Sequence, residues 1–450
     1  MSLLLVKAPA LRKAAPSPAP ALAVMKQPAA WARPVELATV HAFAWLAATC
    51  GAGLLMALLL LFPRLGAALG PLTYGRWMPL HLNLSLYGWL ALPLVALLFR
   101  AYLPREGRGV ARASAAAVHL WSASLLVGAV SWLSGRTTAK PFLDWEGAAR
   151  FAYLAALAFL AGALAAGLFR RFREGTSRAA CWALAGLWLA LLGVPAAMVI
   201  ATSPATYPPI NPDTGGPTGA SLLGSTLGVV FIFLGTPPLL GLADRRPGRL
   251  RAVLTVAGAL TVHWAFFAFV AQSAPSHREP LQIAAVASLL VWAWLLPPWL
   301  RRFEWPEGSR RWLLAFLTWG GVLLGTAVPM FLPGFLDRIK FTNALVGHSH
   351  LAMAGMASSF VGLLLAVLNR GTRLRGVLGD RAAFGLWHAG NAVHVTVLAL
   401  AGALEAADPG VVFRGDASIT VLYAFRALAG LAMLTAAARW LARAAGRSLR

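Results

Sequence analysis

Two histidines lie one residue apart in an apolar stretch, FTNALVGHSHLAMAGMASSF, which covers residues 341–360. Histidine is the commonest metal ligand in proteins, so this pair is the first place in the sequence to look for chemistry. Each residue of a helix advances by about 100°, so His348 and His350 project about 200° apart. The two side chains therefore cannot hold one metal ion together, and they indicate two cofactors on opposite sides of one helix.

Haem suits an imidazole on an apolar helix, because its iron needs an axial nitrogen ligand and its ring needs an apolar cage. A haem with two histidine ligands needs a second imidazole at a similar depth on another helix. His81, in YGRWMPLHLNLSLYGWLALP, is the best-placed partner. Taken alone, His81 is equally well explained as a histidine at the headgroup level, at the start of a membrane span.

Membrane-spanning helices must position these histidines. The 450-residue chain has 59% hydrophobic and 12% charged residues, a composition too apolar for a soluble domain of this size. Apolar runs of about 20 residues, long enough to cross ~30 Å of hydrocarbon, recur along the chain. We expect an all-α membrane bundle of twelve helices, at residues 36–63, 79–103, 113–134, 149–169, 179–202, 219–243, 251–274, 280–300, 312–335, 341–368, 382–404 and 417–442.

Arginines set the expected topology. The formal charge is +24, and clusters of arginine follow every second span, whereas the loops between them are poor in cations or carry acids. The positive-inside rule then places both termini in the cytoplasm and requires an even number of spans. The arginines form no single stripe or tail, so we expect no nucleic-acid partner and a lipid bilayer instead.

The chain is expected to form one membrane domain with two tails. Residues 1–35 form a basic, Ala/Pro-rich cytoplasmic tail, residues 36–443 the twelve-helix domain, and residues 444–450 a short cytoplasmic tail. Cys50 and Cys181 lie within spans without CxxC spacing, which indicates neither disulfides nor a thiolate metal site. The acidic residues lie in loops or near span ends, which disfavours a carboxylate-driven pump. The remaining isolated histidines are expected to make hydrogen bonds between helices: His41, His119, His388 and His394.

Several stretches resemble subunit I of the haem-copper oxidase superfamily, especially the cbb-type cytochrome c oxidases and the nitric oxide reductases. YGRWMPLHLNLSLYGW is similar to the second-helix motif of that family, and FTNALVGHSHLAMAGMASSF to its tenth-helix motif. LTVHWAFFAFVAQSAPSHREPLQ is similar to the seventh-helix stretch, and VLYAFRALAGLAML to the last helix. The resemblance covers roughly residues 36–443.

The resemblance implies a set of ligands and a function. His81 and His350 would ligate a low-spin, b-type haem, and His348 would be the proximal and catalytic ligand of a high-spin haem. Electrons would pass from the first haem to the second, where oxygen or nitric oxide is reduced. It also implies a respiratory protein of the bacterial inner membrane, served by an electron-donating subunit of the cytochrome c or cupredoxin type.

The chain departs from this family at the copper site. The family holds its active-site metal with one histidine on helix six and two on helix seven, and the matching positions here are Ser225, Ser276 and His277. One imidazole with two hydroxyls is a poor copper site, so copper is not expected and His277 is interpreted as a remnant. His263 lies 14 residues before His277, about 21 Å along a helix, which excludes a shared ion.

Three functions remain open. The first is an oxidoreductase of the terminal oxidase type, and the second is a diverged haem protein that senses a gas or transfers electrons without copper. The third is a histidine-dependent, proton-coupled transporter without haem. Four cations near the outer span ends are candidates to pair with haem propionates: Arg278, Arg338, Arg414 and Lys340.

Overall fold

The structure, a computed structural model, describes residues 29–104, 106–175, 177–203 and 216–448. Within these residues, twelve helices are long and apolar enough to cross a membrane, which confirms the expected number of spans and the all-α class. They are α1 (Ala32–Leu61), α3 and α4 (Tyr74–Asn83 and Ala91–Tyr102), α5 (Arg108–Leu133), α6 (Gly147–Arg173), α7 (Arg178–Thr202), α8 (Gly219–Leu240), α9 (Arg249–Val270), α10 and α11 (Pro280–Ser288 and Val291–Leu300), α12 (Arg310–Phe331), α14 and α15 (Asn343–His350 and Ser358–Leu368), α16 (Arg381–Ala407) and α18 (Ala417–Ser448).

Helices dominate because the bilayer offers no water to the backbone, so each span must satisfy its own N–H and C=O groups. Two spans contain a π-helical turn: Leu84–Leu90 joins α3 to α4, and Leu351–Ala357 joins α14 to α15. Among the described residues, three short α-helices lie in loops outside the spans: α2 (Pro63–Ala68), α13 (Phe335–Ile339) and α17 (Val411–Arg414).

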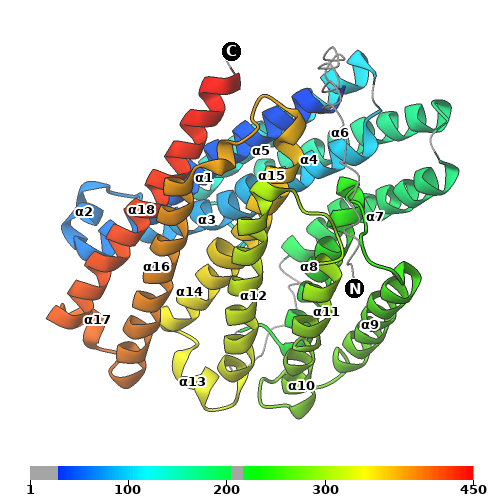
Figure 1. Cartoon of the computed structure of the whole chain (residues 1–450). Coiled ribbons are helices and arrows are strands. Elements are labelled where there is room, and N and C mark those ends of the chain that lie inside the picture. Colours follow the sequence, from blue (N-terminus) through cyan, green and yellow to red (C-terminus); the bar gives the residue numbers. More distant parts are fainter. Residues whose placement is uncertain (1–28, 105, 176, 204–215, 449–450) are drawn as a thin grey trace, which may run out of the picture.

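Helices distant in sequence pack together around the histidines. Figure 1 shows α18 running beside α1 and α16, and these are among the most extensive helix contacts of the bundle. α14 packs on α16, and α1 packs on α3. On the other side of the tenth span, α12 packs against α15 and the π-helical turn Leu351–Ala357. The tenth span therefore has one face toward α16 and another toward α12.

Ion pairs join loops that the sequence places at the same end of the bundle. Arg302, after the eighth span, binds Asp244, after the sixth, at 3.1 Å. At the other end, His277, after the seventh span, binds Asp337, after the ninth, at 2.9 Å. Alternate loops thus lie at opposite ends, as the arginine pattern predicts. The assignment of the arginine-rich end to the cytoplasm stays a prediction.

The expected tails differ from the observed helix ends. Residues 1–28 of the predicted N-terminal tail lie outside the described residues, and α1 already begins at Ala32. α18 continues to Ser448, so most of the predicted tail 444–450 is helical. Polar partners hold this extension: Arg443 pairs with Asp380 at 3.0 Å, and Arg447 donates to a backbone carbonyl of the loop before α16.

Candidate functional site

The HSH pair lies at the end of α14, directly before the π-helical turn Leu351–Ala357. The two rings contact different helices. The Nδ1 of His348 lies 3.4 Å from the Oγ1 of Thr326 on α12, whereas His350 faces histidine rings on α3 and α16. This agrees with the separation of about 200° that helical geometry gives these positions. The two imidazoles therefore belong to two separate sites.

His350 and His81 face each other across the bundle. Their ring centres lie 6.1 Å apart and their planes are inclined by 23°. When two imidazoles bind one metal atom from opposite sides, each metal–nitrogen bond is about 2.0–2.1 Å and each nitrogen lies about 1.1 Å from its ring centre. The two ring centres are then about 6.3 Å apart. The observed distance between the ring centres is close to this value.

Backbone carbonyls fix the protonation state of both rings. The Nδ1 of His81 donates to the carbonyl oxygen of Thr49 at 2.8 Å, and the Nδ1 of His350 donates to that of Val346 at 2.9 Å. Because a carbonyl oxygen only accepts, each Nδ1 carries the proton, and each Nε2 of the neutral ring keeps its lone pair. Metal ligation through Nε2 requires this state of the ring.

The backbone around both histidines departs from a regular α-helix. The π-helical turn Leu84–Leu90 begins shortly after His81, and Leu351–Ala357 begins directly after His350. Such turns inside α-helices are frequent at functional sites. A Cβ atom at Gly53 of α1 would lie only 2.8 Å from the Cε1 of His81. A glycine at this position lets α1 pack directly against the edge of the His81 ring.

The rings of His81 and His350 line a cavity of about 270 Å³, named here the histidine cavity. Its walls come mainly from α1, α3, α14, α16 and α18 and are largely apolar. Its large apolar side chains include Leu46, Leu54, Met78, Trp89, Met353 and Met433. An apolar wall with a few polar groups is typical of cofactor sites.

Arg426 of α18 brings a positive charge into the histidine cavity, although it is only 5% exposed. Its Nη1 donates to the Oδ1 of Asn343 at 3.2 Å, and the Asn343 side chain donates in turn to Glu405. Within the described residues, its Nε has no hydrogen-bond partner. A buried guanidinium with an unused donor suits an anionic group of a ligand. The sequence signal was an arginine inside the last apolar span, which we did not single out.

The cations expected to pair with propionates lie elsewhere. Arg278 and Lys340 approach Asp337 at 3.4 and 3.6 Å, and Arg414 binds Asp408 and Asp416. None of these cations lines the histidine cavity, and neither does Arg338.

Three of the isolated histidines have partners on other helices. The Nδ1 of His41 lies 2.6 Å from the Oγ of Ser122, and the ring of His119 meets that of His41 edge-on at 5.2 Å. The Nδ1 of His388 accepts from the indole of Trp319 at 3.0 Å. The expectation of hydrogen bonds between helices is confirmed for His41 and His388.

For His394 the same expectation stays a prediction. This residue of α16 is 7% exposed and lines the histidine cavity, with its ring centre 4.5 Å from that of His350. Within the described residues, its ring nitrogens make no hydrogen bond of regular geometry, and the ring interacts with the backbone of Arg426 on α18. His394 is therefore a further polar group directed at the site, which the sequence alone did not separate from the other histidines.

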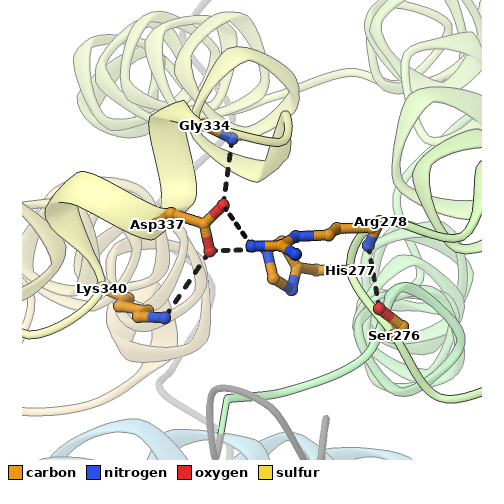
Figure 2. A network of polar contacts seen from close by, with 6 residues as sticks. All are labelled: Ser276, His277, Arg278, Gly334, Asp337 and Lys340. Carbon is orange, nitrogen blue, oxygen red and sulfur yellow. Dashed lines mark hydrogen bonds and ion pairs between the residues drawn. The ribbon is translucent and has the colours of Figure 1, made fainter.

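The expected remnant of the copper site has a different partner. His277 is fully buried in the loop between α9 and α10, and its Nε2 donates to the Oδ1 of Asp337 at 2.9 Å. Figure 2 shows that the same carboxylate also accepts from the Gly334 N–H, at 3.2 Å, and approaches Arg278 and Lys340. This cluster of Gly334, Asp337, His277, Arg278 and Lys340 is named the Asp337 cluster.

Opposing influences act on the Asp337 carboxyl. Burial raises its pKa, whereas the Gly334 N–H, His277 and Arg278 lower it, and the net result is a pKa below the ordinary value. Asp337 therefore stays ionised and holds the two loops together.

The other residues matched to the copper site have hydrogen bonds of their own. Ser225 of α8 is exposed, and its hydroxyl donates to the carbonyl of Leu222 at 3.2 Å. Ser276 accepts from the backbone N–H of Arg278 at 3.3 Å. The Nδ1 of His263 on α9 donates to its own helix, to the carbonyl of Ala259, at 3.0 Å.

Across the described residues, no three His, Cys, Asp or Glu side chains come close enough to hold a metal ion by themselves. Comparison of the chain with protein-family models and with curated proteins gives no match.

Proposed function

We propose that this protein binds a low-spin haem between His81 and His350, and a second, high-spin haem on His348, for electron transfer in the membrane. The observation that carries the proposal is the geometry of the His81–His350 pair. Two nearly parallel imidazoles on separate helices stand 6.1 Å apart, and a backbone carbonyl holds each Nδ1 proton. When bound, the haem iron supplies one-electron redox chemistry.

The residues around the pair fit haem better than a bare metal ion. A haem brings four nitrogen donors of its own and needs only axial ligands from the protein, so a cluster of three protein ligands is not required. The apolar wall of the histidine cavity suits the macrocycle. Arg426 offers a buried cation with an unused Nε–H to the anionic edge of such a ligand.

The surroundings of His277 favour a haem protein without copper. Of the three positions matched to copper ligands, only His277 carries an imidazole, and one imidazole with two serine hydroxyls is a poor copper site. Ser225 is exposed on α8 and bonds to its own helix. We therefore favour electron transfer or gas binding over the reduction of oxygen or nitric oxide.

The proposed function also implies a particular membrane and an electron donor. Electron transfer of this kind takes place in a respiratory membrane, here the bacterial inner membrane. It requires a donor, and a cytochrome c or cupredoxin-type subunit is the expected kind.

The test is an optical spectrum of the protein purified in detergent from a host that makes haem. Reduced and reduced-plus-CO spectra are recorded, and haem, iron and copper are counted per polypeptide. We expect two haems, a CO-binding component and no copper. Stoichiometric copper would contradict the reading of Ser225 and Ser276. Protein that never contains haem would overturn the proposed function and leave the transporter hypothesis.

A further inference from the structure

The loop between α5 and α6 forms one part of the wall of the histidine cavity. Of the described residues that line this cavity, Pro141 and Phe142 alone come from a loop, and all the others belong to spans. Pro141 is exposed and Phe142 is partly buried. A ligand that enters the cavity must therefore pass either this loop or a gap between two packed spans.

The backbone of this loop is strained beside the cavity. Residues 137–142 are named here the loop tip. Ala139 and Phe142 have φ angles of 57° and 66°, and among the described residues they are the only ones other than glycine with a positive φ. A side chain makes the left-handed region unfavourable, and such residues persist where their surroundings hold them. The loop tip thus has a conformation that depends on its contacts.

Hydrogen bonds hold the loop tip in place. The hydroxyl of Tyr87, in the π-helical turn after His81, donates to the Phe142 carbonyl at 2.7 Å. The Oγ1 of Thr138 donates to the Leu143 carbonyl at 2.8 Å, and the Nζ of Lys140 donates to backbone carbonyls at the end of α7. Because water can replace each of these partners at a surface, breaking one bond costs little net free energy.

The residues that follow the loop tip are fixed more firmly. Asp144 is only 2% exposed, and its carboxylate accepts from the Asn83 amide at 2.9 Å. Its carbonyl accepts from the Trp132 indole, and the next residue, Trp145, is fully buried. Before the loop tip, Gly135 has a φ of 86°, and glycine tolerates changes of φ that other residues resist. The loop tip therefore lies between a firm anchor and a flexible glycine.

The spans around the cavity are a poorer way in. α1 packs on α3 and α18, and α14 packs on α16. Parting two packed spans breaks contacts along several helical turns, whereas a loop with few buried contacts opens locally at a lower cost in free energy. The loop tip is therefore the part of the cavity wall that opens most easily.

We propose that the loop tip is the gate of the histidine cavity. It swings away from Tyr87 to admit a ligand at the end of the bundle opposite the arginine clusters, and it closes again over the bound ligand. Tyr87 is a positioning residue, since its hydroxyl holds the closed gate and its side chain does not line the cavity. The inference rests on the proposed function for the identity of the ligand, haem, but the gate controls access to the cavity with or without haem.

The first test uses the two native cysteines as reporters in the haem-free, full-length protein in detergent. Cys50 lines the histidine cavity, whereas Cys181 is fully buried on α7 and does not. In a Cys181→Ser background, the rate at which a charged, water-soluble methanethiosulfonate labels Cys50 is measured. Tyr87→Phe should raise this rate by about two- to tenfold, the change in an opening equilibrium when one hydrogen bond is lost.

Two controls separate the opening of the gate from general loosening. Ser134→Ala removes an exposed hydroxyl bond at the end of α5 and should leave the labelling of Cys50 unchanged. In a Cys50→Ser background, Tyr87→Phe should leave the labelling of Cys181 unchanged. Equal Cys50 rates in Tyr87→Phe and wild type would overturn the inference, and so would a parallel rise at Cys181.

The second test follows haem itself. Haem entry is measured by stopped-flow absorbance, and haem exit by transfer to an excess of a haem-free globin. The Tyr87–Phe142 bond closes the gate in both the empty and the loaded protein, so Tyr87→Phe should speed entry and exit by the same factor. Haem affinity and the low-spin spectrum should stay unchanged. Faster exit alone, with a lower affinity, would overturn the gate. Protein that binds no haem would contradict the proposed function only, because Cys50 labelling tests the gate independently.

Discussion

The imidazoles of His81 and His350 lie 6.1 Å apart with each Nδ1 donating to a backbone carbonyl, that of Thr49 for one ring and that of Val346 for the other. The two acceptors differ in origin. Val346 belongs to the same helix as His350, one turn earlier, whereas Thr49 belongs to α1 and His81 to α3. The orientation of His81 therefore depends on how closely α1 packs on α3.

This dependence gives a prediction for Gly53. A Cβ atom at this position would lie 2.8 Å from the His81 ring, so Gly53→Ala must push the ring or the helix away. Changes in groups that orient a metal ligand commonly reduce metal affinity by about 10- to 100-fold, and we expect haem affinity to fall in that range. Haem titration of the purified variant measures this effect. Gly51→Ala is the matched control, because nothing lies within 4 Å of a Cβ atom there; equal haem affinities would contradict the prediction.

The two histidines of α14 should have separable roles. Because His348 faces α12 and His350 faces His81, His348→Ala should remove the CO-binding component and leave the low-spin spectrum. His350→Ala should remove the low-spin spectrum. Loss of an axial ligand lowers the haem content of its own site and leaves the other haem site filled. We therefore expect about one haem per chain in each variant. Reduced and reduced-plus-CO spectra measure both outcomes, with the exposed His119→Ala as control; a variant that loses both components together would speak against two sites.

Much of the bundle could be predicted because the bilayer leaves few alternatives. A run of about 20 apolar residues in hydrocarbon must be a helix, which fixed the twelve spans. Helical periodicity fixed the opposite directions of His348 and His350. Both arguments use only residues close together in the sequence.

The parts of the site that escaped prediction depend on which helices become neighbours. Gly53 and Thr49 come from α1, which packs on α3, and Arg426 comes from α18, which packs on α1 and α16. Only this packing brings them to the cavity of His81 and His350. His394 lines the histidine cavity because α16 packs against α14 and α18, and its own stretch of sequence does not show this. His277 was matched to a copper ligand by its position in the chain, while its actual partner, Asp337, lies in a different loop.

The arrangement of the loops predicts the orientation of the chain. Arginine clusters gather at one end of the bundle, and the Asp337 cluster and the Asp408–Arg414 pair lie at the other. Cationic loops stay in the cytoplasm, so the C-terminus should lie there as well. A reporter that is active only in the cytoplasm should therefore be active when it is fused after Ser448. A reporter active only outside should respond when inserted near Asp408. Activity in the reverse pattern would invert the topology.

The Asp337 cluster gives a prediction about stability. Asp337→Ala removes the acceptor of the fully buried His277 Nε2, and a lost buried hydrogen bond to a charged group costs about 1–3 kcal/mol of unfolding free energy. Asp408→Ala breaks an ion pair whose two side chains are about half exposed and screened by water, so it should cost less than Asp337→Ala. The unfolding midpoints of the two variants in detergent measure this difference, and equal midpoints would show that the cluster adds little.

The Asp337 carboxylate also makes the difference in stability between wild type and Asp337→Ala depend on pH. Because the pKa of Asp337 is lowered in the folded protein, the unfolded chain binds a proton more readily, and protonation favours unfolding. The stabilisation is fully present above the ordinary aspartate pKa of about 3.9 and is lost as the pH falls through the lowered value. Wild type and Asp337→Ala should therefore differ in unfolding midpoint at neutral pH and converge in acid. A difference that persists unchanged into strong acid would mean that the Asp337 charge does not hold the loops together.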